Sequence, residues 1–539
     1  MYRNQSAVTQ KFAMVPRAEI PRSTFKMPKT LKTTFDASVL VPIFCEEVLP
    51  GDTWSVNMTA FARLATPIFP IMDNLYLDTF FFFVPNRLVW TNWVKFMGEQ
   101  NSPTDSISFT VPTCTSPAGG SAVGSIFDHF GIPVAGQVGG GNTITFNALP
   151  LRAYNRIWQN WFRDENLIAT GANILNQNDG PDPATDFTLL KRGKRPDYFT
   201  TCLPWPQKGN TAVSLPLGST APLRSDGNSP IIRGGAGANA GLQFTAGTVG
   251  TAATLQFATS AGALNFGTAG TAFTGIYADL STATAATINQ LRTAFQIQRL
   301  LERDARGGTR YTEIIRSHFG VISPDQRLQR PEYLGGGTTP LILNPVAQTS
   351  GTNASGTTTP LGNLAAVGTI LSRNGFSQSF TEHGYIIGLA NVRADLTYQQ
   401  GLRKMFSRST RYDFYFPVFA NLGEQAVLNK EIYMDGSAND NNVFGYQERW
   451  GEYRYSPNQI NALFRSTAAG TIDAWHLAQR FSVLPTLGPT FMEEAVPLQR
   501  ALAVGAAANG AQIIFDSYFD MTATRPLPMY SVPGMIDHF

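Results

Sequence analysis

Four consecutive phenylalanines, Phe80–Phe83, lie within the stretch LYLDTFFFFVPNRLVWTNWVKFM, residues 75–97. Neighbouring residues of a β-strand point to opposite faces of a sheet, so both faces of this strand would be aromatic. Burying each large apolar side chain is worth roughly 1.5–3 kcal/mol, which favours a strand covered on both sides. We therefore expect two layers, or one layer and a neighbouring subunit, to sandwich it. Asp78 and Pro85 interrupt the stretch, which is too short to span a bilayer.

The composition indicates a protein whose surface is largely covered. Charged residues make up 15% of the chain, against about 25% in a typical globular domain, while 12% are aromatic. Protein interfaces are depleted of charge and enriched in aromatic side chains. We therefore expect a subunit of a tight assembly.

The three cysteines, Cys45, Cys114 and Cys202, are too few and too widely spaced for a disulfide framework or a CxxC metal site. The first residues, MYRNQSAVTQ, lack the apolar core of a secretory signal, and no window approaches the roughly 18 apolar residues of a membrane span. We expect a soluble protein, made and assembled in a reducing cytoplasm, without a membrane partner.

The first 35 residues carry a concentrated positive charge. Seven lysines and arginines face a single acid, Glu19, whereas the whole chain has a net charge of only +3. A basic arm on a slightly acidic body is a common arrangement for binding a polyanion. We interpret residues 1–35 as an internal arm, with a solvated tail as the alternative. Its candidate nucleic-acid contacts are Arg17, Arg22, Lys26, Lys29 and Lys32.

Two further clusters combine cations with aromatic rings. Single-stranded nucleic acid favours this mixture, because cations bind phosphate and rings stack on unpaired bases. The first cluster, KRGKRPDYF, offers as candidates Lys191, Arg192, Lys194, Arg195, Tyr198 and Phe199. The second cluster, LRKMFSRSTRY, contains Arg403, Arg408 and Arg411. The alternative, pairing with acids across a subunit boundary, stays open for the first cluster and is favoured for the second.

Apolar patterns predict many strands and few helices. Residues 33–64 are expected to form two strands joined at Pro50-Gly51-Asp52, and apolar runs alternate with turns through the final third of the chain. Helices are predicted near 86–97, over 150–166 and from about 284 to 306. Without regular βα alternation, the pattern favours a mainly β, antiparallel sandwich of jelly-roll type with long loop insertions. The aromatic candidates for core or subunit contacts are Phe80, Phe82, Trp90, Trp93, Trp158 and Trp161.

The segment 209–283 is rich in small residues. Between 211 and 280, 41 of the 70 residues are Gly, Ala, Ser or Thr and only four are charged. Three apolar–polar–apolar triplets predict short strands with one buried face each. Because these faces are too small to form a core alone, we expect neighbouring subunits to complete it. The candidate core residues are Leu242, Phe244, Leu255, Phe257, Leu264 and Phe266.

A second nearly uncharged stretch, 347–380, is rich in turn residues and is predicted to be another surface loop. We therefore divide the chain into the arm, 1–35, and one sandwich domain, 36–539, which carries both insertions.

The chain lacks the common catalytic motifs. Its five histidines stand outside HExxH spacing, and neither a GxSxG nucleophile elbow nor a GxxxxGK[ST] phosphate loop occurs. Asp179, Asp182 and Asp186 could gather a calcium ion, but the prolines among them favour a capped turn. We expect no catalytic residue, no cofactor and no metal site.

Several long sequence segments resemble one family. They include TTFDASVLVPIFCEEVLPGDTW, YNRIWQNWFRDENL, FGYQERWGEYRY and the closing MYSVPGMIDHF. These segments are similar to the major capsid protein of gokushoviruses, small icosahedral phages of the Microviridae with circular single-stranded DNA. The similarity is dense over 17–207 and 290–539, whereas 211–280 and 347–380 depart from it.

The resemblance implies an eight-stranded jelly-roll subunit, one copy per asymmetric unit of a T=1 shell in the virion. It also implies a protrusion at the three-fold axes, for which 209–283 is the natural candidate and which we expect to bind a host receptor. The other implied partners are the DNA genome and a small basic DNA-binding virion protein. A β-rich carbohydrate-binding protein or adhesin is the alternative, and an enzyme is a third reading without residues to support it.

Overall fold

The structure is a computed structural model. It describes residues 21–171, 175–209, 288–322, 324–347, 349, 364–503 and 510–530, and the short strands 223–225, 232–234, 264–266, 276–278, 353–354 and 357–358. The chain divides into two compact units, one formed by Met1–Pro206 with Ala305–Phe539 and the other by Gln207–Asp304. None of the helices in these described ranges combines the length and the hydrophobicity that a bilayer crossing requires.

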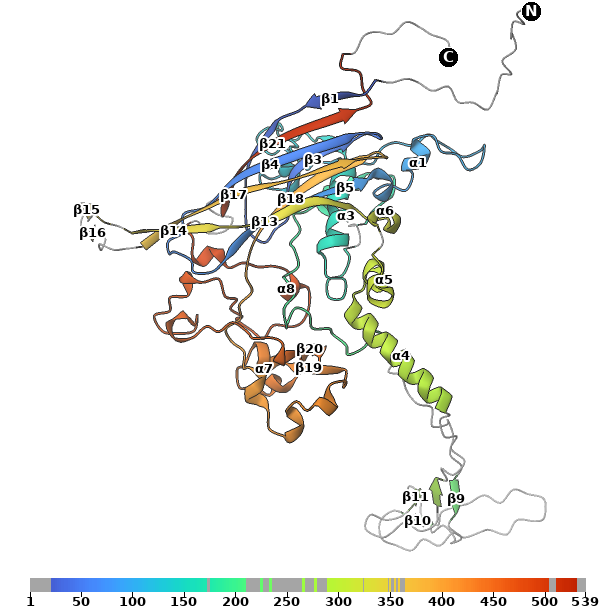
Figure 1. Ribbon diagram of the computed structural model, residues 1–539, viewed down its shortest axis with the longest axis vertical. Helices are drawn as coiled ribbons and strands as arrows, with labels where there is room; N and C mark the ends of the chain where they lie inside the picture. Colours follow the sequence, from blue (N-terminus) through green and yellow to red (C-terminus); the bar gives the residue numbers. More distant parts are fainter. Residues whose placement is uncertain are drawn as a thin grey trace, which may run out of the picture. The chain divides into compact units, whose positions relative to one another are not determined.

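Two antiparallel sheets form the centre of the larger unit (Figure 1). The first sheet has the order β1-β21-β4-β17-β14, with β2 also paired to β21, and the second has the order β13-β5-β18-β3. The strands of the first sheet are β1 (Ser23–Lys26), β2 (Lys29–Phe35), β4 (Thr53–Leu64), β14 (Ile342–Ala347), β17 (Leu364–Ser379) and β21 (Ile513–Arg525). The strands of the second sheet are β3 (Val41–Val48), β5 (Leu75–Pro85), β13 (Glu332–Pro340) and β18 (Gly384–Ala394).

The chain passes from one sheet to the other at the links β2–β3, β3–β4, β4–β5, β13–β14 and β17–β18. Repeated exchange between two antiparallel sheets is typical of a viral capsid sandwich. The predicted mainly β, antiparallel sandwich is therefore confirmed. The expected count of eight strands is not confirmed, since the two sheets contain six and four strands.

Strand β4 explains why the sheets pack face to face. Its alternate residues Trp54, Val56 and Met58 are fully buried in the core between the sheets, as their spacing predicts. Gly51, whose φ is 89°, lies in the turn that leads from β3 to β4, where a residue without a Cβ avoids strain. The two predicted strands thus exist, and they belong to opposite sheets.

Strand β5 is covered on both sides by its own chain. Phe81 and Phe83, which are 0% and 4% exposed, point into the core between the sheets. Phe82, which is 1% exposed, packs on the other side against the rings of Trp161 and Phe162. The prediction of a doubly covered strand is confirmed, and both covering layers come from this chain rather than from a neighbouring subunit.

A helical layer covers the outer side of the second sheet. Helix α3 (Leu149–Ile157) packs on β5 and β18 and continues as a π-helical turn over Trp158–Phe162. The helical stretch ends at Phe162, so the helix predicted over 150–166 was too long. Helix α4 (Ile288–Gly307) confirms the helix predicted from about 284 to 306. The remaining described helices are α1 (Trp93–Phe96), α2 (Ile126–His129), α4 (Ile288–Gly307), α5 (Tyr311–Phe319), α6 (Asp325–Leu328), α7 (Asn429–Ile432) and α8 (Pro489–Met492).

Two predicted boundaries are wrong. Residues 364–379, expected in a surface loop at 347–380, form β17, because alternate residues such as Ile370 and Phe376 are buried against the core. Residues 23–35, expected to belong to an internal basic arm, form β1 and β2, which pair with β21 at the edge of the first sheet. Strand β17 pairs with β4, and β1 and β2 pair with β21, so both segments have strand partners that are distant in the sequence.

The remaining strands form small sheets. Within the larger unit they are β6 (Thr113–Thr115), β7 (Thr145–Asn147), β8 (Asp182–Pro183), β15 (Asn353–Ala354), β16 (Thr357–Thr358), β19 (Glu424–Leu428) and β20 (Val443–Glu448). In the smaller unit, β9 (Leu223–Ser225) pairs with β12 (Ile276–Ala278), and β10 (Ile232–Gly234) pairs with β11 (Leu264–Phe266). The triplet at 264–266 is therefore a strand, as predicted. The other candidate core residues, Leu242, Phe244, Leu255 and Phe257, lie outside the described residues.

Candidate nucleic-acid and subunit interfaces

The arm cations that the structure describes are engaged within the chain. Their ion pairs are Lys26–Asp520 (3.8 Å), Lys29–Glu46 (2.9 Å) and Lys32–Asp516 (2.9 Å). The side chains of Lys26 and Lys32 are still 68% and 76% exposed, so these surface pairs contribute little to stability. Arg22 donates a hydrogen bond to the carbonyl of Gly51. Arg17 lies outside the described residues.

The prediction that residues 191–199 contact nucleic acid is wrong for three of its members. Tyr198 and Phe199 are buried, with the Tyr198 ring stacked on Tyr455 and the Phe199 ring against Tyr398, so their rings cannot stack on bases. Lys194 is also buried, with its Nζ 4.3 Å from the centroid of the Phe491 ring. The other three cations pair with carboxylates of the same chain: Lys191–Glu493, Arg192–Asp78 and Arg195–Asp395.

Asp78 explains why this cluster faces inward. Its Oδ2 lies 2.5 Å from Arg192 and 2.6 Å from Arg393, in a cluster that also includes the buried Glu494. Burial raises the pKa of Glu494 to about 7, while the neighbouring Arg192 and Arg393 lower it in part. The cations therefore join β5 and β18 to the adjoining loops rather than face a ligand.

The second basic cluster is divided between interior and surface. Arg408 pairs with Glu452 at 3.0 Å, so its acidic partner lies within the chain and not across a subunit boundary. Arg411 is exposed, and its guanidinium lies 5.3 Å from the centroid of the Phe416 ring. Arg403 lines a cavity of about 530 Å³. Arg403 and Arg411 thus remain candidates for contacts with another molecule.

Residues 405–422, here called the aromatic segment, present apolar side chains to solvent. The sequence predicted strands for the apolar runs of this region, but the segment forms short 3-10 turns at Arg411–Asp413 and Pro417–Phe419. Its exposed apolar residues are Met405, Phe406, Tyr412, Phe414, Tyr415, Phe416, Val418 and Leu422. A soluble monomer rarely leaves a large contiguous apolar surface in water, so this segment is a candidate subunit contact.

The aromatic candidates for core or subunit contacts belong to the core. Three are buried and three are partly buried against the same cluster: Phe82, Trp90 and Trp158, and Phe80, Trp93 and Trp161, respectively. The indole of Trp158 donates a hydrogen bond to the Lys191 carbonyl (2.8 Å), and that of Trp161 to the Pro331 carbonyl (3.0 Å). The indole N–H groups of Trp158 and Trp161 are therefore hydrogen-bonded within the chain, and their rings pack in its core.

Two of the three aspartates at 179–186 have different partners within the chain. Asp179 accepts hydrogen bonds from the indole of Trp90 (2.7 Å) and the amide of Asn92 (2.8 Å), whereas Asp182 pairs with Arg152 (2.6 Å). Across the described ranges, no group of three His, Cys, Asp or Glu side chains gathers in a way that could hold a metal ion.

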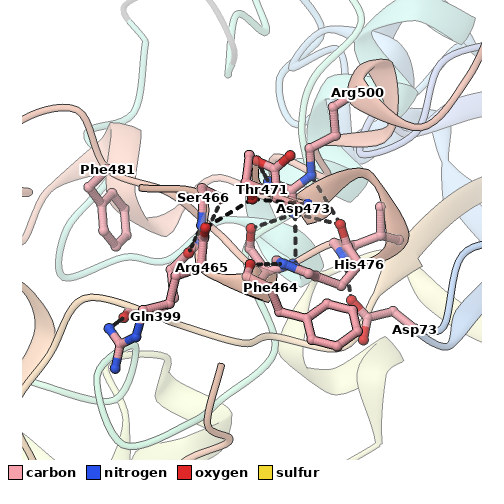
Figure 2. Close-up of polar contacts among 12 residues, drawn as sticks. Asp73, Gln399, Phe464, Arg465, Ser466, Thr471, Asp473, His476, Phe481 and Arg500 are labelled. Carbon is pink, nitrogen blue, oxygen red and sulfur yellow. Dashed lines mark hydrogen bonds and ion pairs between the residues drawn. The ribbon is translucent and has the colours of Figure 1, made fainter. Parts of the chain in front are cut away.

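Figure 2 shows a buried polar network around His476. The Nδ1 atom of His476 accepts a hydrogen bond from the Ala478 amide (3.1 Å), so Nε2 carries the proton and donates to the Phe464 carbonyl (2.7 Å). Arg500 donates to the carbonyls of His476 (3.0 Å) and Ala478 (2.9 Å). Because both ring nitrogens are occupied by backbone groups, His476 holds these loops together and is not a catalytic base.

The solvent side of the first sheet, here called its outer face, carries residues that the sequence analysis missed. Phe61 of β4 and Tyr518 of β21 are 50% and 43% exposed there. Arg63 and Arg373 are also exposed on this face, and neither is paired with a carboxylate among the residues that the structure describes. The sequence contained a signal for this face: Phe61 and Arg63 occupy the polar side of the alternating segment TWSVNMTAFARL.

Comparison with known proteins gives consistent matches over nearly the whole chain. Residues 13–535 match the family of the phage capsid protein (F protein). The chain is 50% identical over 545 residues to capsid protein VP1 of Bdellovibrio phage phiMH2K and 41% identical over 599 residues to capsid protein VP1 of Chlamydia phage 1. It is 37% identical over 556 residues to capsid protein VP1 of Spiroplasma virus 4. Each alignment covers 98% of this chain and 98% of the relative.

Proposed function

Because this chain belongs to the phage capsid protein (F protein) family, as its resemblance to gokushovirus major capsid proteins predicted, we propose that it forms a T=1 icosahedral shell around circular single-stranded DNA. As a capsid protein it is a structural component of the virion, and its activity is self-assembly. The proposal further includes assembly in the bacterial host cytoplasm, a small basic DNA-binding protein inside the shell and attachment to a host receptor.

The aromatic segment is the observation that carries this proposal. Val418 is 85% and Tyr412 is 68% exposed in the single chain, although each large apolar side chain removed from water contributes roughly 1.5–3 kcal/mol. Arginine and aromatic residues are enriched among the residues that dominate binding energy at interfaces, and Arg411 lies against Phe416 here. Burial of this segment against a neighbouring copy would supply the driving force for a closed shell.

Host attachment is assigned to the insertion 209–283. The strand pair β10–β11 lies within the sequence that β9 and β12 bracket, so the insertion begins and returns through two nested antiparallel pairs. A nearly uncharged segment of small residues suits recognition of a cell-surface sugar or protein. These nested pairs support the assignment of the insertion as a protrusion.

Imaging of the purified protein by electron cryomicroscopy tests the proposal. We expect closed particles with one subunit per icosahedral asymmetric unit, which elute in the void volume of a size-exclusion column and contain nuclease-protected single-stranded DNA. A shell of higher triangulation number would refute the T=1 arrangement. A stable monomer or small oligomer at high concentration would refute self-assembly into a shell.

A further inference from the structure

We infer that the outer face of the first sheet is the surface that holds the packaged single-stranded DNA. This inference rests on the proposed function, and it replaces the 191–199 cluster as the nucleic-acid contact on the folded body. It follows from three features of the face, which are its excess positive charge, its exposed rings and its position next to the basic N-terminal segment.

The excess charge resides on two arginines. The two acids that point outward from these strands are each paired with a lysine: Asp516 with Lys32 and Asp520 with Lys26. In register, Arg63 lies opposite Thr369 and Arg373 opposite Thr59, and hydroxyl groups do not neutralise them. Across the described residues neither arginine has a carboxylate partner, so both guanidinium groups are available for phosphate.

Exposed rings lie beside these arginines. Phe61 of β4 is opposite Asp516 of β21, and Tyr518 is opposite Thr59, so Phe61 and Tyr518 are diagonal neighbours whose backbone positions are roughly 7–8 Å apart. Leu371 is opposite Phe61 on the other side and is 71% exposed. Aromatic rings on adjacent strands of an open sheet are the means by which RNA-recognition domains hold two or three unpaired bases. The outer face therefore combines the two groups that single-stranded DNA requires.

The N-terminal segment enters at the edge of the same face. Strand β1 begins at Ser23 and pairs with β21, and the residues before it include Arg3, Lys11 and Arg17 against the single acid Glu19. A second copy of the chain is a poorer occupant, because two copies of this face would bring like charges together. A polyanion complements both the face and the segment that leads into it.

Ultraviolet crosslinking of intact wild-type particles tests this assignment directly. Nucleotide adducts mapped by mass spectrometry should occur on the peptides that contain Phe61 or Tyr518. Adducts confined to other surfaces, or protection of these two residues by another protein copy, would overturn the inference. Neither result would affect the proposed shell, which fails separately if wild-type protein forms no particles.

Charge variants provide the second arm of the test. Binding of labelled oligo(dT) to full-length subunits should weaken in Arg63→Gln/Arg373→Gln, and the slope of log K against log [NaCl] should fall by about 1.4, since each lost phosphate contact contributes about 0.7. Arg299→Gln, at an exposed position on α4, is the matched control and should leave the slope unchanged. An unchanged slope in the double variant would overturn the inference, and if that variant does not fold, the wild-type crosslinking map decides.

Discussion

Arg152 and Asp182 form a two-point ion pair inside the protein, with Nε 2.6 Å from Oδ2 and Nη2 2.7 Å from Oδ1. Both side chains are almost closed to solvent, at 3% and 0% exposure. Arg152 also donates to the Val89 carbonyl at 3.1 Å. One buried guanidinium thus ties helix α3 to strand β8 and to the segment that contains Val89.

Removal of the buried negative charge should destabilise the fold strongly. Asp182→Asn leaves Arg152 buried without a counter-charge, and we expect the free energy of unfolding to fall by about 3–5 kcal/mol in urea denaturation. Asp520→Asn, which breaks the exposed pair with Lys26, is the matched control and should cost less than about 1 kcal/mol. Equal losses in the two variants would contradict the prediction.

Stability should decrease with rising pH because of Glu494. Burial raises the pKa of this carboxyl from 4.5 to about 7, so the folded state binds a proton that the unfolded state has lost. Between pH 4.5 and 7 its contribution should therefore fall, by about 3 kcal/mol in total at 1.36 kcal/mol per pKa unit. Glu494→Gln should remove this component of the pH dependence, measured as unfolding free energies at pH 5 and pH 7.5. If Glu494→Gln had the same pH dependence of stability as the wild type, Glu494 would not be the source of that dependence.

Two phenylalanines, one in the core and one on the outer face, should differ strongly in their response to truncation. Phe81→Ala opens a cavity in the core between the sheets, and we expect a loss of about 3–5 kcal/mol in unfolding free energy. Phe61→Ala removes a ring that is 50% exposed in the single chain and should change stability by less than about 1 kcal/mol. A loss at Phe61 as large as that at Phe81 would show that the outer face is covered within the chain.

An acidic residue in the aromatic segment should prevent assembly without unfolding the chain. Val418→Asp places a charge at a position that is 85% exposed in the single chain and buried in the proposed contact. We expect a wild-type circular dichroism spectrum, together with loss of the void-volume peak in size-exclusion chromatography. Val123→Asp, at a position that is 74% exposed outside the segment, is the control. Normal particles of Val418→Asp would exclude this segment as a shell contact.

The insertion can be shortened at a position that the strand register defines. Ser225 of β9 lies directly opposite Ile276 of β12, so residues 226–275 can be replaced by Asn-Gly, a two-residue hairpin turn. We expect particles of normal yield that no longer adsorb to host cells. Loss of the particles themselves would assign the insertion to assembly, and normal adsorption would exclude it as the attachment site.

Local patterns were sufficient where a residue's environment depends on its immediate neighbours in the chain. The four phenylalanines of β5 required cover on both faces, and the alternation of Trp54, Val56 and Met58 identified the buried face of β4. The segments shared with capsid proteins likewise identified the family from sequence alone. Each of these inferences uses only side-chain size, polarity and order.

The availability of a charge for an external ligand was decided by the tertiary structure. Arg192 pairs with Asp78, 114 residues away in the sequence, and Arg195 pairs with Asp395, 200 residues away. The cations of a cluster that was predicted to contact DNA are therefore neutralised by carboxylates of the same chain. Arg63 and Arg373 stand on the outer face without such partners in the described residues. A sequence lists the charges of a chain, but which of them neutralise one another depends on distances that only the folded backbone sets, because electrostatic attraction acts through space and not along the chain.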